Sequence, residues 1–382
     1  MLWLAGARDK WSVGDVYYDA PMPQPDITRQ RLINQGLVKP ALKTPSTVVA
    51  TLGAVQAQDY AASKWGIAQR TAGLTDARIE REIDDGSMVR THILRPTWHF
   101  VAAADIHWML ALTAPRVHAA NAYWYRWLEV DDALTRRGRA VLTKALSDGK
   151  QLTRAELGQA LTKAKIQVTN SMRLACIVMR AELDGAICSG ARRGKQFTYA
   201  LLEERVPKPV VLERDAALCE LARRYFTTRG PATVEDFAWW SGLTKADGKR
   251  AVEAAATHLQ HVSIEGRSYW CPAAERVARI ASPAVHLLPN FDEFFVGLKD
   301  RSAFGARLEA AGVKARTRVL SGHALVVNGQ IVGGWKRTLA TRTVIVEPKP
   351  LIRLDEAERR AVDVAAQKLG RFVGAPVEML WS

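Results

Sequence analysis

The feature of this chain that most constrains its fold is a pattern that occurs three times: a group of helices followed by a two-stranded hairpin. In the first copy the predicted helices are Ile27–Gln35, a segment opened by Thr44, Tyr60–Arg70 and Asp76–Asp85. The predicted strands are Val89–Leu94 and Thr97–Ala102. Helices followed by a hairpin are the plan of a winged helix-turn-helix unit.

The same plan returns in the middle of the chain. Leu152–Leu157 contains a capped helix start, and Met172–Leu183 is a long helix with one apolar face. The segments Ala186–Ser189 and Gln196–Leu201 read as strands that flank a basic hairpin tip. The second copy is therefore complete.

A third copy follows. Thr233–Trp240 is a predicted helix, Ser241–Leu243 is a turn, and Thr244–His258 is the candidate recognition helix. His261–Ile264 and Ser268–Cys271 form the wing. A single short helix-turn-helix pattern is easily met by chance, so the threefold repetition carries the argument.

The last third of the chain has a different pattern. Asn328–Gly329 between two apolar runs is the strongest short-range hairpin signal. Asp355 caps a closing helix that runs to Gly370. The predicted strands are Val285–Leu288, Leu325–Val327, Gln330–Val332 and Thr343–Val346. We expect a small antiparallel β domain with one packed helix.

The predicted fold class is α+β, with three tandem winged helix-turn-helix units followed by a β-rich C-terminal domain. The expected units are residues 26–130, 131–212 and 213–280, and the β domain is 281–382. Residues 1–25 lack helical and strand periodicity, and we interpret them as a disordered extension or as the result of a start codon placed upstream of the true one at Met22.

The net charge favours a polyanionic partner. Lys and Arg number 54 against 39 Asp and Glu, which gives +15. Such an excess favours nucleic acid, because each phosphate contacted releases a condensed counterion. The alternative is a protein from a proteome that is basic throughout, and charge alone does not decide between them.

Composition also limits which cellular compartment and which cofactors we expect for this protein. No run of about 18 apolar residues exists, which argues against a membrane span, and residues 1–20 lack the apolar stretch of a signal peptide. The four cysteines form no CxxC pair and the eight histidines no HExxH. We therefore expect a cytoplasmic, nucleoid-associated protein with reduced thiols and no metal or organic cofactor.

Clusters of cations are the candidate phosphate contacts. Arg192, Arg193 and Lys195 occupy the second wing tip, and Lys336 and Arg337 are interpreted as a second hairpin end. Each cluster could equally be a solvated turn. Two further cations lie on the third unit's recognition helix, namely Lys249 and Arg250.

Tryptophan is abundant, with 12 residues in the chain. Two pairs stand at neighbouring or helical spacing, Trp239 with Trp240 and Trp124 with Trp127. We predict that both pairs belong to the core rather than to base-stacking platforms.

The segment between Leu52 and Tyr60 is unusual because it holds two glutamines, Gln56 and Gln58, two residues apart. On a continuous helix such residues point away from each other, so they converge only if the chain turns there. A turn between the second and third helices of the first unit would suffice. A polar helix end explains the same residues, and the pattern alone does not choose.

The sequence resembles the AlkZ/YcaQ-type tandem winged-helix DNA glycosylases. Their Gln-aliphatic-Gln (or Gln-aliphatic-Asp) motif reads Gln56-Ala57-Gln58 here, within Gly53–Tyr60. Three further segments match the family in order, at Arg90–His99, Leu288–Glu293 and Asn328–Trp335. The resemblance covers the chain from about Thr28 to its end.

The resemblance implies that Gln56 and Gln58 are catalytic and that the substrate is an alkylated purine in double-stranded DNA, including bulky or crosslinked guanines. An N7-alkylated guanine is already a cationic leaving group, so holding a water near the oxocarbenium-like sugar suffices. Neither glutamine can deprotonate that water, and Asp59 is a minor candidate for a base.

No lysine stands beside the motif to act as a Schiff-base nucleophile, so we expect a monofunctional enzyme without lyase activity. We also expect a monomer with no obligate protein partner. The alternative is a non-catalytic winged-helix transcription regulator. Such a regulator would be a dimer with one base-reading helix.

Overall fold

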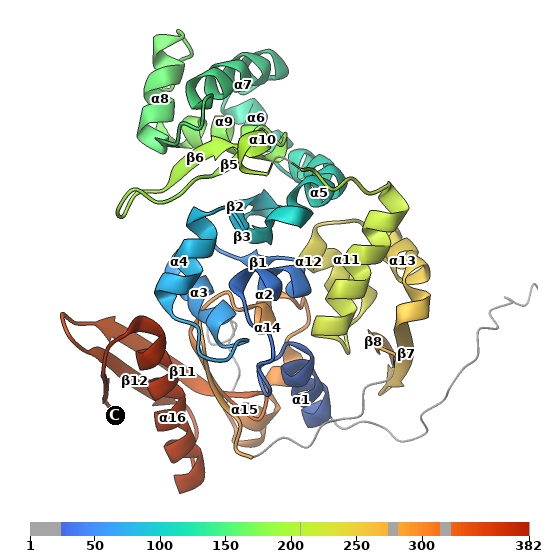
Figure 1. Cartoon of the computed structure of the whole chain (residues 1–382). Helices are drawn as coiled ribbons and strands as arrows, with labels where there is room; N and C mark the ends of the chain where they lie inside the picture. Colours follow the sequence, from blue (N-terminus) through green and yellow to red (C-terminus); the bar gives the residue numbers. More distant parts are fainter. Residues whose placement is uncertain (1–23, 207, 274–281, 314–321, 382) are drawn as a thin grey trace, which may run out of the picture.

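The structure is a computed structural model that describes residues 24–206, 208–273, 282–313 and 322–381. Figure 1 shows the first helix-and-hairpin unit, in blue, at the centre of the molecule. The second unit, in green, lies on one side of it, the third, in yellow, on another, and the C-terminal domain, in orange and red, on a third. The extension predicted at residues 1–25 lies outside the described part except at its end, where helix α1 begins at Gln24.

In the first unit the hairpin strands are joined by a short third strand, which gives a sheet of order β1-β3-β2. Thr44, Asp59 and Thr75 each accept the backbone N–H of the residue three positions on, which fixes where three helices begin. The elements are α1 (Gln24–Asn34), α2 (Pro45–Leu52), β1 (Val55–Gln56), α3 (Tyr60–Ala68), α4 (Asp76–Asp84), β2 (Met88–Ile93) and β3 (Arg95–Ala102).

The second unit repeats this order of elements, with a sheet of order β4-β6-β5. Thr153 and Glu156 form a capping box at the start of one helix, and Asn170 caps the next. The linking elements are η1 (Ala103–Asp105), α5 (Ile106–Ala120) and α6 (Ala122–Trp127). The unit consists of α7 (Asp132–Leu146), β4 (Leu152–Thr153), α8 (Arg154–Lys163), α9 (Ser171–Leu183), β5 (Ile187–Ser189), β6 (Thr198–Leu201) and α10 (Leu202–Arg205).

The third unit has a two-stranded sheet, β7-β8, and a single bridge between Ala232 and Trp270 in the place of the third strand. The helix predicted at Thr244–His258 is shorter than expected, because its last turn is a separate 3-10 helix. The elements are α11 (Arg214–Arg229), α12 (Val234–Ser241), α13 (Lys245–Ala254), η2 (Ala256–His258), β7 (Leu259–Ile264) and β8 (Arg267–Pro272).

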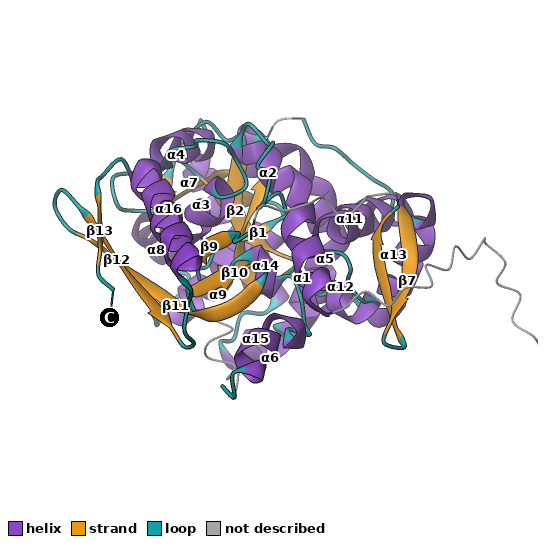
Figure 2. Ribbon diagram, turned by 90° about the horizontal axis from the view of Figure 1, so that it is seen from below, coloured by secondary structure: helices purple, strands orange, loops and turns teal. Residues whose placement is uncertain are grey.

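The C-terminal domain holds a five-stranded sheet of order β13-β12-β11-β10-β9. The prediction of a purely antiparallel sheet is wrong at one edge, since β13 pairs parallel to β12 after the chain returns along α16. Figure 2 shows the long β11 and β12 strands projecting from the body. The elements are β9 (Val285–Leu288), α14 (Glu293–Val296), η3 (Ser302–Phe304), α15 (Ala306–Ala310), β10 (Ala324–Val327), β11 (Gln330–Leu339), β12 (Val344–Pro350), α16 (Glu356–Val373) and β13 (Val377–Met379).

One buried apolar core runs through several of the predicted domains. It includes Val89 of the first unit, Leu110 of α5, Cys188 of the second unit, Leu221 of α11 and Val326 of the C-terminal sheet. The second unit has a further core of its own. The first sheet is therefore held against α11, α12 and the C-terminal domain, and these surroundings position the candidate site.

The turn between α12 and α13 packs directly on the hairpin turn of the first unit. Gly242 has φ +70°, and a Cβ there would lie 2.1 Å from the carbonyl oxygen of Leu94. Only glycine allows this close approach and this left-handed backbone together.

Candidate active site

Gln56 and Gln58 lie in the short connection between α2 and α3, which borders β3. The N–H of Ala57 donates to the carbonyl of Trp98 at 2.7 Å, and the N–H of Trp98 donates to Oε1 of Gln58 at 3.4 Å. Strand β1 ends at Gln56, and the chain bends at Gln58. The motif therefore lies where the chain turns between the second and third helices, as expected, with a two-residue strand in that connection.

The two side chains lie at different depths. Gln58 is exposed, whereas Gln56 is 8% exposed. The backbone N–H of Gln56 donates to Oε1 of Glu293 at 2.8 Å. The motif therefore runs from the surface into the body of the protein.

Glu293 is the buried carboxylate that fixes this strand. Its Oε2 binds Arg229 of α11 at 2.6 Å and accepts the indole N–H of Trp240 of α12 at 3.0 Å. The side chains of Glu293 and Arg229 are at most 1% exposed. A buried charge needs such partners, and this one ties the first unit, the third unit and the C-terminal domain to Gln56.

A row of polar side chains crosses the first sheet at the level of Gln56. Gln56 faces His99 of β3, and His99 faces Thr91 of β2. Each carries one buried atom with no hydrogen-bond partner in the described part of the chain: Oε1 of Gln56, Nε2 of His99 and Oγ1 of Thr91. Buried polar atoms of this kind are commonly satisfied by a bound water, and three of them in one row leave polar groups for a water to bridge.

His99 is a neutral base in this environment. Its Nδ1 lies 2.9 Å from the carbonyl oxygen of Thr97. A carbonyl only accepts, so Nδ1 carries the proton and Nε2 presents a free lone pair. Burial lowers the pKa of His99 well below its usual range, and the side chains of Arg95, His92 and Arg229 lower it further.

Asp59, our minor candidate for a base, caps α3. Its Oδ1 accepts the backbone N–H of Ala62 at 3.0 Å. Burial lowers the pKa of Arg337, and the Asp59 carboxylate acts in the opposite direction. These observations give Asp59 a structural role and bring Arg337 close to the motif.

Arg192, between β5 and β6 of the second unit, is held within the protein. Its guanidinium lies 3.3 Å from Glu80 and stacks over the rings of Tyr60 and Phe197 at 5.0 and 5.3 Å. The tip of this hairpin thus packs on the first unit. Only part of this cationic cluster faces solvent.

The other predicted phosphate contacts of the second and third units are exposed. Arg193 pairs with Glu156 at 2.8 Å and Arg250 with Asp215 at 2.7 Å, both at the surface. Lys195 and Lys249 are also exposed. Their contacts with phosphate remain predictions.

Lys336 and Arg337 do not lie at a hairpin end. They are in the middle of β11, opposite Glu347 and Val346 of β12. The expectation was wrong because β11 extends to Leu339, beyond the strand that the apolar run indicated. Lys336 is exposed, whereas Arg337 is partly buried.

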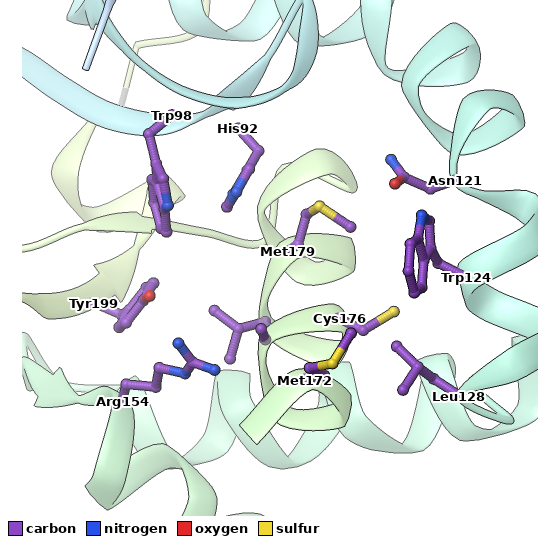
Figure 3. Close-up of a pocket in the computed structure, with 12 residues that line it drawn as sticks. His92, Trp98, Asn121, Trp124, Leu128, Arg154, Met172, Cys176, Met179 and Tyr199 are labelled. Carbon is purple, nitrogen blue, oxygen red and sulfur yellow. The ribbon is translucent and has the colours of Figure 1, made fainter. Parts of the chain in front are cut away.

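A pocket opens on the side of the first sheet that faces the second unit, and Figure 3 shows its lining. It encloses about 240 Å³ and is walled by Trp98 and Tyr199 and by the thioethers of Met172 and Met179. Trp98 is also the residue whose N–H contacts Gln58. Trp98 therefore lines the pocket and also contacts the motif.

The prediction that the tryptophan pairs are core is wrong for three of the four residues. Trp124, which lines the pocket, is 44% exposed, Trp127 is 56% exposed and Trp239 is 45% exposed. Trp240 is fully buried. Helical spacing alone does not distinguish a core face from an exposed aromatic surface.

Sequence analysis named the two glutamines but not His99, Thr91 or Glu293, although each lies in a segment that carries the resemblance. A signal was present for His99. It is a polar residue among the buried residues of the strand that ends in Phe100, Val101 and Ala102. Its partners lie on other strands, which a linear pattern does not reveal.

Within the described residues, no cluster of three or more His, Cys, Asp or Glu side chains could hold a metal ion. All four cysteines are free thiols. No helix in the described ranges is both long and apolar enough to cross a membrane.

The fold matches that of a DNA glycosylase. The family model described as DNA glycosylase AlkZ-like matches residues 49–372, and the chain belongs to this family. Among curated proteins, the interstrand DNA cross-link repair glycosylase of Streptomyces sahachiroi is 26% identical over 368 residues, 90% of this chain and 95% of that protein. The solved structure of Streptomyces sahachiroi DNA glycosylase AlkZ matches with a TM-score of 0.76 and 25% identity, over 94% of this chain and all of that one.

Proposed function

We propose that this DNA glycosylase hydrolyses the N-glycosidic bond of alkylated purines of the N7-alkylguanine type in duplex DNA, through Gln56 and Gln58. The observation that carries the proposal is the placement of both glutamines in the short connection between α2 and α3, one exposed and one nearly buried. Their amide oxygens can orient a water and stabilise positive charge on the sugar as the base leaves.

The selectivity of the proposed reaction follows from the neutral side chains. A glutamine does not protonate a leaving base, so the enzyme depends on a base that is already cationic. Alkylation at N7 supplies that charge, and unmodified purines lack it. We infer that bulky and crosslinked N7 adducts are substrates as well, since the curated relative is named for interstrand cross-link repair.

The product we propose is an intact abasic strand. Lys64, the lysine nearest the motif in sequence, is 5% exposed and its Nζ binds Asp76 and Glu80 at 2.7 and 2.5 Å. A lysine so engaged is a poor Schiff-base nucleophile.

We further infer that the three helix-and-hairpin units are winged helices that lie along duplex DNA, and that the enzyme acts as a monomer at the nucleoid. The proposed phosphate contacts are the exposed cations Arg193, Lys195, Lys249, Arg250 and Lys336, with Arg337 beside the motif and Arg192 bracing the second wing. The net charge of +15 supports binding that is driven by counterion release.

The test uses a duplex with a single N7-methylguanine. The protein should release the methylated base and leave a strand that breaks only after alkali treatment, as seen on a denaturing gel. Breakage without alkali would indicate lyase activity. If the protein releases no methylated base from this duplex, the proposed substrate class is wrong.

A further inference from the structure

Gln56 and His99 form a close pair across the first sheet. They are register partners, but the N–H of Gln56 donates to Glu293 rather than to β3. This is the geometry of a non-hydrogen-bonded antiparallel pair, in which Cα atoms are about 4.5 Å apart and side chains approach most closely. Both side chains leave the same face of the sheet.

The two side chains present acceptors toward a common space. Oε1 of Gln56 and Nε2 of His99 are buried, and neither has a donor among the residues that the structure describes. Two acceptors cannot bond to each other, whereas one water molecule donates two hydrogen bonds. Gln56 is the more exposed of the two, at 8% against 0% for His99. Gln56 is therefore the member of the pair nearer to solvent, and His99 is the member nearer to the core.

We propose that Gln56 Oε1 and His99 Nε2 together hold the attacking water, and that His99 is the catalytic base that accepts its proton. This proposal rests on the glycosylase function above and supplies the base that two glutamines lack. Thr91, on the other side of His99, places its hydroxyl in the same row.

The bonds and charges of the step balance. The C1′–N9 bond breaks, and its electron pair leaves with the alkylated purine, which becomes neutral. The water oxygen forms a bond to C1′ and one water proton moves to Nε2 of His99, giving an abasic sugar and an imidazolium. The imidazolium then returns its proton to solvent.

A weak base is sufficient at this position. Once the C–O bond forms, the attacking water is an oxonium, which is a strong acid. A low pKa for His99, caused first by burial and then by Arg95, His92 and Arg229, keeps the imidazole neutral at physiological pH. Two buried carboxylates lie beside this cluster: Glu293 pairs with Arg229 and Glu182 with His92, and both offset part of the positive field.

The test compares His99→Gln with wild type in single-turnover release of N7-methylguanine. Glutamine keeps an acceptor but cannot take a proton, so we expect about a 10²-fold slower reaction, the lower end for general-base catalysis. Duplex affinity should be unchanged. His286→Gln is the matched control, because His286 is also buried with an unpartnered Nε2 and lies in the C-terminal sheet.

The dependence of the rate on pH distinguishes a base from a structural residue. In wild type the rate should stay level just below pH 6.5 and fall as the pH drops through the lowered pKa of His99, and His99→Gln should lack this fall. A variant that is slower by the same factor at every pH, or as fast as wild type, overturns the proposal. Failure of the proposed function is a separate result, since wild type itself would then release no base.

If His99→Gln does not fold, a measurement on the wild-type protein tests the proposal. Long-range nitrogen–proton NMR on histidine-labelled protein reports the tautomer of each imidazole. We expect a histidine that is protonated on Nδ1, stays neutral well below pH 6.5, and remains in the spectrum of His286→Gln. Absence of any such histidine contradicts the proposal.

Discussion

The backbone N–H of Gln56 donates to Oε1 of Glu293 at 2.8 Å, across 237 residues of sequence. The same carboxylate binds Arg229 at 2.6 Å, so one buried side chain connects the motif strand to two other parts of the molecule. The position of the proposed catalytic strand therefore depends on an ion pair outside the first unit.

Glu293→Ala should reduce both stability and activity. The change leaves Arg229, which is 0% exposed, as a buried cation without its partner. Breaking such a pair costs about 3–5 kcal/mol, which denaturant titration measures. Asp215→Ala breaks the exposed pair with Arg250 and should cost about 1 kcal/mol or less. Equal losses in the two variants would show that Glu293 does not hold the strand.

Lys195→Ala should weaken duplex binding and reduce its dependence on salt. Lys195 is exposed at the second wing tip, and the loss of one phosphate contact lowers the slope of log affinity against log salt by about 1. An unchanged slope in binding titrations would indicate that this wing points away from DNA.

Arg192→Ala should behave differently, because Arg192 is bound to Glu80 and stacked on Tyr60. We expect a loss of stability on the order of 1 kcal/mol and a nearly unchanged salt slope. A slope reduced as much as in Lys195→Ala, with unchanged stability, would assign Arg192 to the DNA contact instead.

Stability should fall in mild acid. Burial lowers the pKa of His286 to about 4, helped by the cations of Lys368 and Arg70. An unfolded histidine has a pKa of about 6.5, so between these values the unfolded state binds a proton that the folded state refuses. Stability from this group is present above pH 6.5 and is lost as pH falls toward 4. Denaturant titrations at several pH values should show a shallower loss for His286→Gln. An unchanged dependence would assign the acid sensitivity to other groups.

Local signals in the sequence accounted for most element positions. Val285–Leu288 is a strand with the predicted bounds, and Asp355 caps the closing helix. Such features depend on neighbours along the chain, as caps and hairpin turns do. The length of β11 and the parallel strand β13 depend on pairing with distant strands, so they were missed.

The same distinction applies to the candidate site, where the motif was visible in the sequence and its partners were not. Gln56 and Gln58 are two residues apart in sequence and were named from a motif. The partners of Gln56 come from register, which places it opposite His99, and from the first residue of α14 in the C-terminal domain, which is Glu293. Pairings of this kind follow from tertiary structure and have no local signature.

The central claim is that Gln56 and Gln58 perform catalysis rather than DNA binding. Both are neutral, so Gln56→Ala with Gln58→Ala should leave duplex affinity nearly unchanged. Removal of one preorganised polar group costs about 10²–10³-fold in rate, and removal of both should abolish excision. Gln58→Glu keeps an acceptor for the N–H of Trp98 and should retain part of the activity.

The most direct measurement is single-turnover release of N7-methylguanine by wild type and the double variant, with affinity measured on the same duplex. We predict release by wild type, none by the double variant, and equal affinities. Release by the double variant at the wild-type rate would contradict the claim.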